Sequence, residues 1–377
     1  MSFLNSETTG RYLLSTFMRR GVLPNSDKLL ARYGRNYEIY REMKNDAHVW
    51  SCMQSRKSGT TALEFLIEPN GAESSNIELI EEIFSNLDIY KIENDILDSL
   101  FYGFQPFEII WKNERINNKE LYIPFKIIPR PQELFSFNEQ GDLLIKGKLN
   151  ELNTVPPFKF LGAVHDPGLN NPFGEPILNK CFWYVTFKNG TTRFWINYTE
   201  KFGSPLLLGQ FQRGASQEEV KQLAELLADM SQDAVIVTPA DFKIDIAEAN
   251  RSQTSDLFGD MIKYCNNEIS KAILSQTLTT EIETGSYAAA NIHFKIRKEL
   301  IRNDSRLVCS IFNELIRYIY RVNNLNGKMP VFRHVINESE NVERIDRDLK
   351  MVQAGIKLSK DYWQRTYGLK ESDFENN

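Results

Sequence analysis

Two long amphipathic segments within residues 257–320, separated by a short polar loop, constrain the fold of this 377-residue chain more than any other feature. Apolar residues recur in both segments at three- and four-residue steps, the spacing of one face of an α-helix. The second helix is expected to begin near Tyr287. The loop between them, residues 277–286, contains nothing larger than leucine or glutamate, so it cannot anchor itself in a core and must be displayed by the helices. The apolar residues are Leu257, Met261, Tyr264, Cys265, Ile269, Ala272 and Ile273 in the first helix, and Val308, Ile311, Phe312, Leu315, Ile316 and Ile319 in the second.

The region before residue 104 is expected to combine helices with one strand. A helix is predicted over residues 45–59, followed by a strand in the sequence TALEFLIEP. Ser75 and Glu78 match a capping box at the start of the next helix, and a further helix is expected to end at Gly103. The first forty residues are polar and of mixed charge, which fits a peripheral arm and a loosely packed N-terminus equally well.

Short strand candidates separated by Asn, Gly and Pro follow, so this part of the chain is expected to be an α+β unit. Residues 139–142 predict a hairpin turn, and the turn-rich stretch over residues 165–174 marks a boundary between units. The strand candidates cover residues 107–111, 122–128, 134–137, 143–145 and 158–164.

The segment over residues 181–199 permits two interpretations. Asn189 and Gly190 stand between two runs of aromatic and β-branched residues, which is a strong signal for a β-hairpin. However, five aromatic residues of this segment fall on one helical face, which favours a single long helix. Local propensity alone favours the hairpin. The five aromatic residues are Trp183, Phe187, Phe194, Tyr198 and Phe202.

A compact unit of strands and one helix is expected next, over residues 203–252. Strands are predicted at residues 206–209, 234–238 and 242–246. Between the first two, Ser216 and Glu219 match a capping box at the start of an amphipathic helix. The sequence therefore places a small αβ insert between two long helices.

Charge and cysteine content argue against several classes of protein. A net charge of -5 does not suit a protein whose main task is to hold nucleic acid tightly, because that requires a surplus of Lys and Arg. Neither a signal peptide nor a membrane-length apolar stretch is present, so we expect no membrane partner. No CxxC pair occurs, and the cysteines are expected to be reduced core thiols rather than zinc ligands or disulfides. They are Cys52, Cys181, Cys265 and Cys309.

Histidines and catalytic motifs give little sign of an enzyme. Nucleotide-binding loops, metalloprotease helices and nucleophile elbows are missing from the sequence, and we expect no cofactor, no metal and no catalytic residue. His48, His293 and His334 are expected to be structural, hydrogen-bonded residues. The His165-Asp166 pair has the most enzyme-like setting, although a turn cap explains it equally well.

Three carboxylates, Asp241, Asp245 and Glu248, lie close enough in sequence to serve a metal-dependent nuclease. Asp241 and Asp245 flank an alternating strand pattern, so a solvated strand face is the favoured interpretation. The nuclease remains an alternative function at this point.

Several blocks of the sequence resemble, in the same order, those of the portal proteins of Mu-type tailed phages. The main block is ISKAILSQTLTTE, followed by a Gly-Ser-Tyr-Ala-Ala element and another helix. Together the blocks span nearly the whole chain, which makes them far more specific than one short pattern. The others are DAHVWSCMQSRKSGT, YGFQPFEIIW, NPFGEPIL with a following aromatic helix, EKFGSPLLLG and AGIKLSKDYWQRTYGL.

The resemblance implies an α+β, portal-like fold with long stem helices, a small αβ clip insert, an αβ wing and a C-terminal helical crown. It favours the long helix over the hairpin for residues 181–199, and we adopt the helix. The implied units are an N-terminal arm and wing over residues 1–175, a first stem helix over 176–202, the clip over 203–252, a second stem helix over 253–276, the tunnel loop over 277–287, and wing and crown helices with a C-terminal segment over 288–377.

The resemblance also implies a function: a non-enzymatic phage portal, or head-to-tail connector, subunit. Such subunits form a closed, twelve-fold ring at one capsid vertex of the virion, and double-stranded DNA passes through it during packaging and ejection. The implied partners are further copies of the chain, the terminase large subunit, capsid or scaffold proteins and the head-tail adaptor. Assembly is implied to take place in the host bacterial cytoplasm.

Two groups of residues receive roles from the resemblance. The aromatic residues of the first stem helix, Trp183 to Phe202, are implied to pack between subunits. The tunnel loop is implied to project hydroxyls and carboxylates towards the DNA, while an ordinary exposed loop is the alternative. A monomeric phage head adaptor or interaction protein with the same helices is a second alternative function. The channel residues are Thr279, Thr280, Glu281, Glu283, Thr284, Ser286 and Tyr287.

Overall fold

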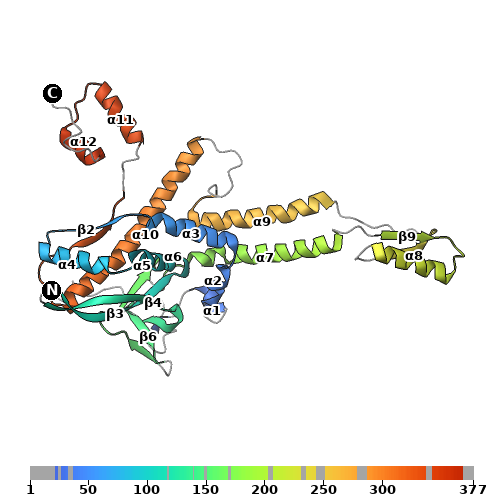
Figure 1. Ribbon diagram of the computed structural model, residues 1–377, viewed down its shortest axis with the longest axis horizontal. Helices are drawn as coiled ribbons and strands as arrows, with labels where there is room; N and C mark the ends of the chain where they lie inside the picture. Colours follow the sequence, from blue (N-terminus) through green and yellow to red (C-terminus); the bar gives the residue numbers. More distant parts are fainter. Residues whose placement is uncertain are drawn as a thin grey trace.

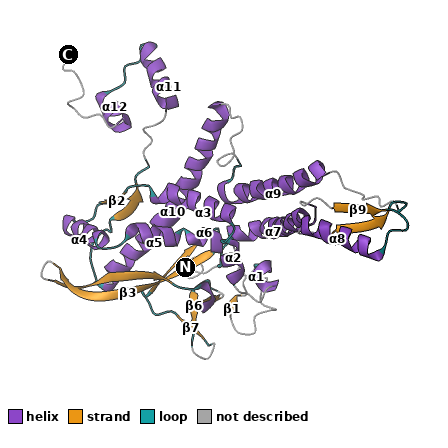
Figure 2. Cartoon of the chain, turned by 45° about the vertical axis from the view of Figure 1, so that its right-hand side comes forward, coloured by secondary structure: helices purple, strands orange, loops and turns teal. Residues whose placement is uncertain are grey.

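The computed structural model shows a body of helices and small sheets, from which two antiparallel helices project with a small α/β unit at their far end (Figure 1). A second view shows a separate pair of short helices that belongs to the C-terminal part of the chain (Figure 2). The mixture of helices and strands confirms the α+β class. The structure describes residues 22–23, 27–32, 37–116, 119–138, 140–147, 151–168, 171–202, 207–230, 235–242, 251–277, 287–336 and 342–367.

Helices α1 to α6, most of them short, precede the first long strand of the body. The N-terminus of α3 is capped by the Asp46 carboxylate, which accepts hydrogen bonds from two backbone N–H groups of the first turn. The predicted capping box at Ser75 is wrong, because α4 already begins at Ser74 and the cap residue Glu73 makes no side-chain cap bond. The helix expected before Gly103 is divided in two at Leu97. The bounds are α1 Lys28–Arg32, α2 Glu38–Met43, α3 Ala47–Thr61, α4 Ser74–Ser85, α5 Ile89–Ile96 and α6 Asp98–Tyr102.

Three small antiparallel sheets complete the body. The predicted hairpin turn joins two paired strands, β5 and β6, whereas β7 was not anticipated. Strand β11 pairs with β2, so residues far apart in the sequence lie side by side. The sheet orders are β1 (Val22–Leu23), β5 (Phe135–Asn138), β6 (Leu143–Lys146) and β7 (Leu152–Thr154); β4 (Lys119–Pro129), β3 (Phe104–Ile116) and β8 (Phe160–Val164); and β11 (Val331–His334) with β2 (Phe65–Glu68).

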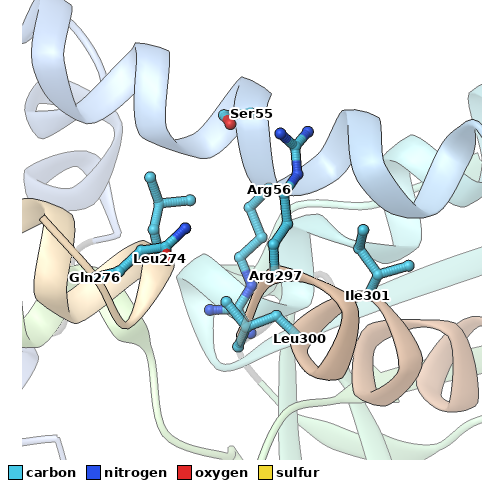
Figure 3. Close-up of a pocket in the computed structure, with 7 residues that line it drawn as sticks. All are labelled: Ser55, Arg56, Leu274, Gln276, Arg297, Leu300 and Ile301. Atoms are coloured by element: carbon cyan, nitrogen blue, oxygen red, sulfur yellow. The ribbon is translucent and has the colours of Figure 1, made fainter. Parts of the chain in front are cut away.

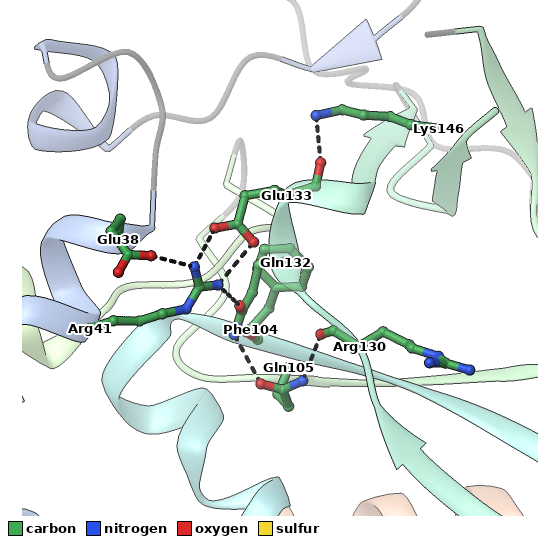
Figure 4. A network of polar contacts seen from close by, with 8 residues as sticks. All are labelled: Glu38, Arg41, Phe104, Gln105, Arg130, Gln132, Glu133 and Lys146. Carbon is green, nitrogen blue, oxygen red and sulfur yellow. Dashed lines mark hydrogen bonds and ion pairs between the residues drawn. The ribbon is translucent and has the colours of Figure 1, made fainter. Parts of the chain in front are cut away.

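A polar network joins helix α2 to the sheets, through the short 3-10 helix η3 (Gln132–Leu134) (Figure 4). The Arg41 guanidinium lies 2.8 Å from a carboxylate oxygen of Glu133 and donates to the Gln132 side chain at 3.3 Å. Gln132 donates in turn to Gln105 at 2.9 Å, and Gln105 donates to the Arg130 carbonyl at 3.0 Å. Because Gln105 and Gln132 are buried, these bonds satisfy polar groups that water cannot reach.

The segment with two interpretations is a single helix, α7 (Ile177–Phe202), which runs antiparallel to α9 (Arg251–Leu274) (Figure 1). The β-branched Thr186, Thr192 and Thr199 fit this helix because each hydroxyl donates to a carbonyl one turn earlier, at 2.7–2.9 Å. The rings of Trp195 and Phe258 stack across the two helices at 6.4 Å. Packing against α9 therefore overrides the local hairpin signal of Asn-Gly.

The unit at the far end of the two helices consists of β9 (Leu207–Phe211), α8 (Gln217–Met230) and β10 (Val235–Pro239), with the strands parallel. The capping box predicted here is confirmed. The Glu219 backbone N–H donates to the Ser216 hydroxyl at 3.2 Å, and the Glu219 carboxylate accepts from the Ser216 N–H at 2.8 Å. The third predicted strand, over residues 242–246, lies almost entirely outside the described residues.

Helix α10 (Tyr287–Val322) is the longest helix of the described chain, and its C-terminal half lies in the core. The Phe312 ring packs against those of Phe84 and Phe332, at centroid distances of 5.6 and 4.4 Å. These three side chains join α10, α4 and β11 in one apolar cluster. The last two helices are α11 (Val342–Gln353) and α12 (Lys360–Tyr367).

Candidate ring interface and channel loop

The expected channel residues fall mostly outside the described part of the chain. Thr279, Thr280, Glu281, Glu283, Thr284 and Ser286 all lie there. Tyr287 is the first residue of α10, and its side chain is not described. What the structure does describe is the base of this loop, where α9 ends and α10 begins.

Hydrogen bonds hold the base of the loop to the body. His293 on α10 bonds through Nδ1 to the Gln276 side chain at 2.8 Å, across the two ends of the loop. Arg56 on α3 donates to both carboxylate oxygens of Asp304 on α10, at 2.8 and 3.0 Å. The same guanidinium donates to the Ile273 carbonyl at 2.7 Å, in the last turn of α9. Helix α3 thus fixes the C-terminal end of α9 and the middle of α10.

A cavity lies beside the contacts of Arg56, between α3, the end of α9 and α10 (Figure 3). Its volume is about 10 Å³, which is room for about one water molecule. Apolar groups of Leu274, Leu300 and Ile301 form much of its wall. The cavity is therefore a packing defect next to a polar anchor and is too small for an organic substrate.

The other end of α3 is bonded to the two projecting helices. The Asp46 carboxylate that caps α3 also lies 2.8 Å from the Lys188 ammonium group of α7, and both side chains are largely buried. His48 bonds through Nε2 to the Ser270 hydroxyl of α9 at 2.8 Å. His48 and His293 are thus hydrogen-bonded to neighbouring elements, as predicted. Helix α3 connects α7, α9 and α10 through side-chain contacts.

The outer face of α7 carries aromatic side chains that no other described part of the chain covers. Trp183, Phe187 and Phe194 are 48, 47 and 68% exposed. Tyr198, by contrast, is half-buried and packs its ring on Phe258 of α9 at 5.8 Å. The side chain of Phe202 lies outside the described residues. Clustered exposed aromatic groups of this size are typical of an interaction surface.

The enzyme-like candidates find structural explanations where the chain is described. Asp241 pairs with Arg213 at 2.6 Å, while Asp245 and Glu248 lie outside the described residues. Within the described part, no three His, Cys, Asp or Glu side chains are placed to hold a metal ion. His165 bonds through Nδ1 to the Glu175 carbonyl at 2.7 Å, which favours the turn-cap interpretation. The four cysteines are free thiols, three of them buried and Cys309 partly so.

One cluster that sequence reasoning missed joins α5, α10 and β11. His334 bonds through Nε2 to the Glu93 carboxylate at 2.8 Å and through Nδ1 to the Ser305 hydroxyl at 2.9 Å. Burial alone would lower the pKa of His334, but the Cys309 thiol at 3.8 Å and Glu93 raise it to about 9. The order of groups is that of a hydrolase triad, yet Glu93, Ser305 and His334 are buried and Cys309 is half-buried. We therefore interpret the cluster as structural. No spacing pattern in the sequence could reveal it, because Glu93 and His334 are separated by 241 positions.

Comparison with known proteins identifies the family. The model of the portal protein of Mu bacteriophage matches residues 37–369, which is most of the chain. The chain belongs to this family. It is 24% identical over 341 residues to the Mu-like prophage FluMu protein gp29 of Haemophilus influenzae, and 23% identical over 358 residues to the portal protein of Escherichia phage Mu. These alignments cover 86 and 90% of this chain but only 65 and 69% of the two relatives.

Solved structures support the same fold. A chain in the virion of a native gene transfer agent particle superposes with a TM-score of 0.57 at 11% identity, covering 88% of this chain and 93% of that one. A chain in the neck of an empty gene transfer agent particle gives the same TM-score at 12% identity, covering 97% of this chain and 100% of that one.

None of the described helices is both long and apolar enough to cross a membrane.

Proposed function

We propose that this chain is a phage portal subunit, which forms a closed ring at one capsid vertex through which double-stranded DNA is packaged and ejected. The match to the Mu portal family over residues 37–369 supports this proposal most directly. The subunit acts as a conduit rather than an enzyme and takes no cofactor. It is a virion component that assembles in the host bacterial cytoplasm.

The projecting helices α7 and α9 correspond in this proposal to the stem, with residues 203–252 as the clip and 277–287 as the tunnel loop. Residues 1–175 form the arm and wing, and residues 288–377 the remaining wing and the crown. The helix pair with a small α/β unit at its far end is consistent with this division. The carboxylates Glu281 and Glu283 would then form a belt around the channel, which repels phosphates and lets DNA pass.

Ring closure explains the uncovered aromatic face of α7. Every subunit in a closed ring uses two different surfaces, one towards each neighbour. Burying the exposed half of an aromatic side chain such as Trp183 or Phe194 is worth roughly 2 kcal/mol. A few such residues on each stem helix provide a large part of the contact energy with the next stem. We propose twelve subunits in the assembled particle, with the terminase large subunit, capsid or scaffold proteins and the head-tail adaptor as further partners.

The first test is the mass distribution of the purified protein, combined with negative-stain images. Rings of about a dozen subunits with a central hole wide enough for a duplex are expected. Replacing Trp183 and Phe194 together by Ser should shift the distribution to smaller species, whereas Asn197→Ala, an exposed polar position on the same helix, should leave it unchanged. Rings that persist in the double variant would refute the role of this face.

Two further results would favour other functions. A protein that stays monomeric at high concentration would favour a head adaptor. Divalent-metal-dependent DNA cleavage that is lost on Asp245→Ala would favour a DNA-processing enzyme. Because mixed charges lie on the helices, we also expect ring assembly to weaken between low and molar salt.

A further inference from the structure

Helices α11 and α12 form a small unit that is built around one buried carboxylate. Asp348, 1% exposed, accepts hydrogen bonds from the hydroxyls of Tyr362 and Tyr367 at 2.7 and 2.8 Å, and from Arg347 at 2.8 Å. Helix α11 ends at Gln353, and Gly355 two residues later has a φ of 90°, which permits a Schellman motif. The two helices therefore hold each other in a defined orientation without help from the body.

No described part of the chain covers the apolar face of α11. Ile345, Leu349 and Val352 recur at four- and three-residue steps, and are 44, 53 and 45% exposed. Both overall views show α11 and α12 standing away from β2 and α5 of the same chain (Figures 1 and 2). An amphipathic helix with its apolar stripe in solvent needs a partner surface.

The body offers a hollow that is lined by apolar side chains together with Thr61, Glu64 and Glu93. It measures about 430 Å³ and lies between the end of α3, strand β2 and the start of α5. Phe65 and Tyr90 line it and remain 38 and 66% exposed, with Leu63 and Ile89 beside them. Like the face of α11, this surface has aromatic and aliphatic groups that its own chain leaves in water.

The charges around the two surfaces are opposite. Exposed Lys350 lies on α11 and exposed Lys357 follows the helix, whereas exposed Glu64 lines the hollow and exposed Asp88 caps α5 next to it. An apolar centre surrounded by charges of complementary sign is the usual composition of a specific protein interface. The hollow is therefore suited to α11 in both chemistry and charge.

The position of α11 favours a neighbour's helix over the chain's own as the occupant of the hollow. Strand β11 ends at the edge of the hollow, where the Val335 N–H donates to the Glu64 carbonyl at 2.7 Å. In both overall views α11 of the same chain lies away from this hollow (Figures 1 and 2). The hollow is thus open to a second copy of the chain, and exchange of an identical element between subunits is an accessible route to oligomers.

We propose that α11 of each subunit docks in the hollow between β2 and α5 of the next subunit, so that the C-terminal unit links neighbours around the ring. The partner is thus a second copy of this chain, and the inference rests on the proposed ring. It names a contact far from the stem, which the aromatic face of α7 does not provide. Burying the exposed half of Leu349 in this contact should strengthen each subunit association by about five- to tenfold.

Cysteine cross-linking of the full-length protein tests which copy is engaged. Chains that carry only Tyr90→Cys are mixed with chains that carry only Val352→Cys and are oxidised mildly. Disulfide-linked pairs are expected in the mixture, and a ladder of linked chains is expected from the double variant. Each single variant alone, and Val352→Cys mixed with Thr199→Cys on the exposed stem, are the controls.

Each outcome decides the matter. An intrachain disulfide in the double variant, without a ladder, would show that α11 folds onto its own body and would overturn the proposal. Rings in electron micrographs without cross-links would overturn it too, while leaving the portal function intact. The lack of both rings and cross-links would count against both. Leu349→Glu should reduce the ring fraction at limiting concentration, and unchanged rings in this variant would contradict the contact.

Discussion

The buried Glu93–His334 pair predicts a stability that depends on pH, and Glu93→Gln is the variant that tests it. His334 is the last residue of β11, and its ring bonds to Glu93 on α5 at 2.8 Å with no solvent exposure of the imidazole. The substitution keeps the shape and one hydrogen-bond acceptor but removes the negative charge. Any change should therefore report the charge interaction rather than a cavity.

The magnitude follows from the raised pKa of His334. Because the pKa rises from about 6.5 to about 9 on folding, the protonated ring stabilises the fold fully below pH 6.5, and this stabilisation is lost as the pH rises through 9. At pH 7, the raised pKa of His334 contributes about 2–3 kcal/mol to the free energy of unfolding. Glu93 and Cys309 both raise the pKa, so removing the Glu93 charge should reduce the free energy of unfolding by about 1–2 kcal/mol at pH 7.

Urea unfolding of both proteins from pH 6 to 10 measures this difference directly. The difference in the free energy of unfolding between wild type and Glu93→Gln should be largest at pH 6–7 and should disappear above pH 9. In NMR spectra of the variant, His334 should titrate at lower pH than in the wild type. Glu81→Gln, an exposed carboxylate on α4, is the matched control and should show no gap. A gap that stays constant over the whole pH range would refute the reasoning, because it would mean that His334 does not titrate between the two states.

Three further substitutions test the fold. Gly174→Ala should destabilise the body by at least about 3 kcal/mol in thermal unfolding, because a Cβ at this position would lie 2.3 Å from a carbonyl oxygen and the backbone φ is 70°. Gly190→Ala is the matched control within α7. An added Cβ there meets open space, so this variant should be stabilised by about 0.5–1 kcal/mol. Arg56→Met should cost about 3–5 kcal/mol in urea unfolding by leaving the Asp304 carboxylate buried without its partner. Ser216→Ala should weaken only the first turn of α8, by about 1 kcal/mol, which amide hydrogen exchange resolves.

Periodic patterns predicted the long elements well. The steps of apolar residues predicted α9 and α10. The capping box at Ser216 was also readable, because both partners lie within one turn. For residues 181–199 the residues alone left hairpin and helix open, and the structure shows the helix, since packing on α9 is a long-range effect that local propensity does not contain.

Side-chain contacts between distant elements could not be predicted. Arg56 and Asp304 are separated by 248 positions, and Asp46 and Lys188 by 142. Each residue taken alone has the sequence context of an ordinary surface charge, and only the packing of α3 across α7, α9 and α10 buries it. The same limit applies to the hollow beside Tyr90, whose lining comes from α3, β2 and α5 together.

The outer face of α7 is not needed for folding of the subunit and is suited to a contact between subunits. The fold requires only the inward side of this helix, where Cys181, Phe182 and Val185 are buried. Trp183, Phe187 and Phe194 are therefore not explained by folding of the monomer, and in water they promote aggregation. A neighbouring stem that covers these side chains would replace non-specific aggregation with a specific contact. The first test of the ring is therefore a substitution on this face.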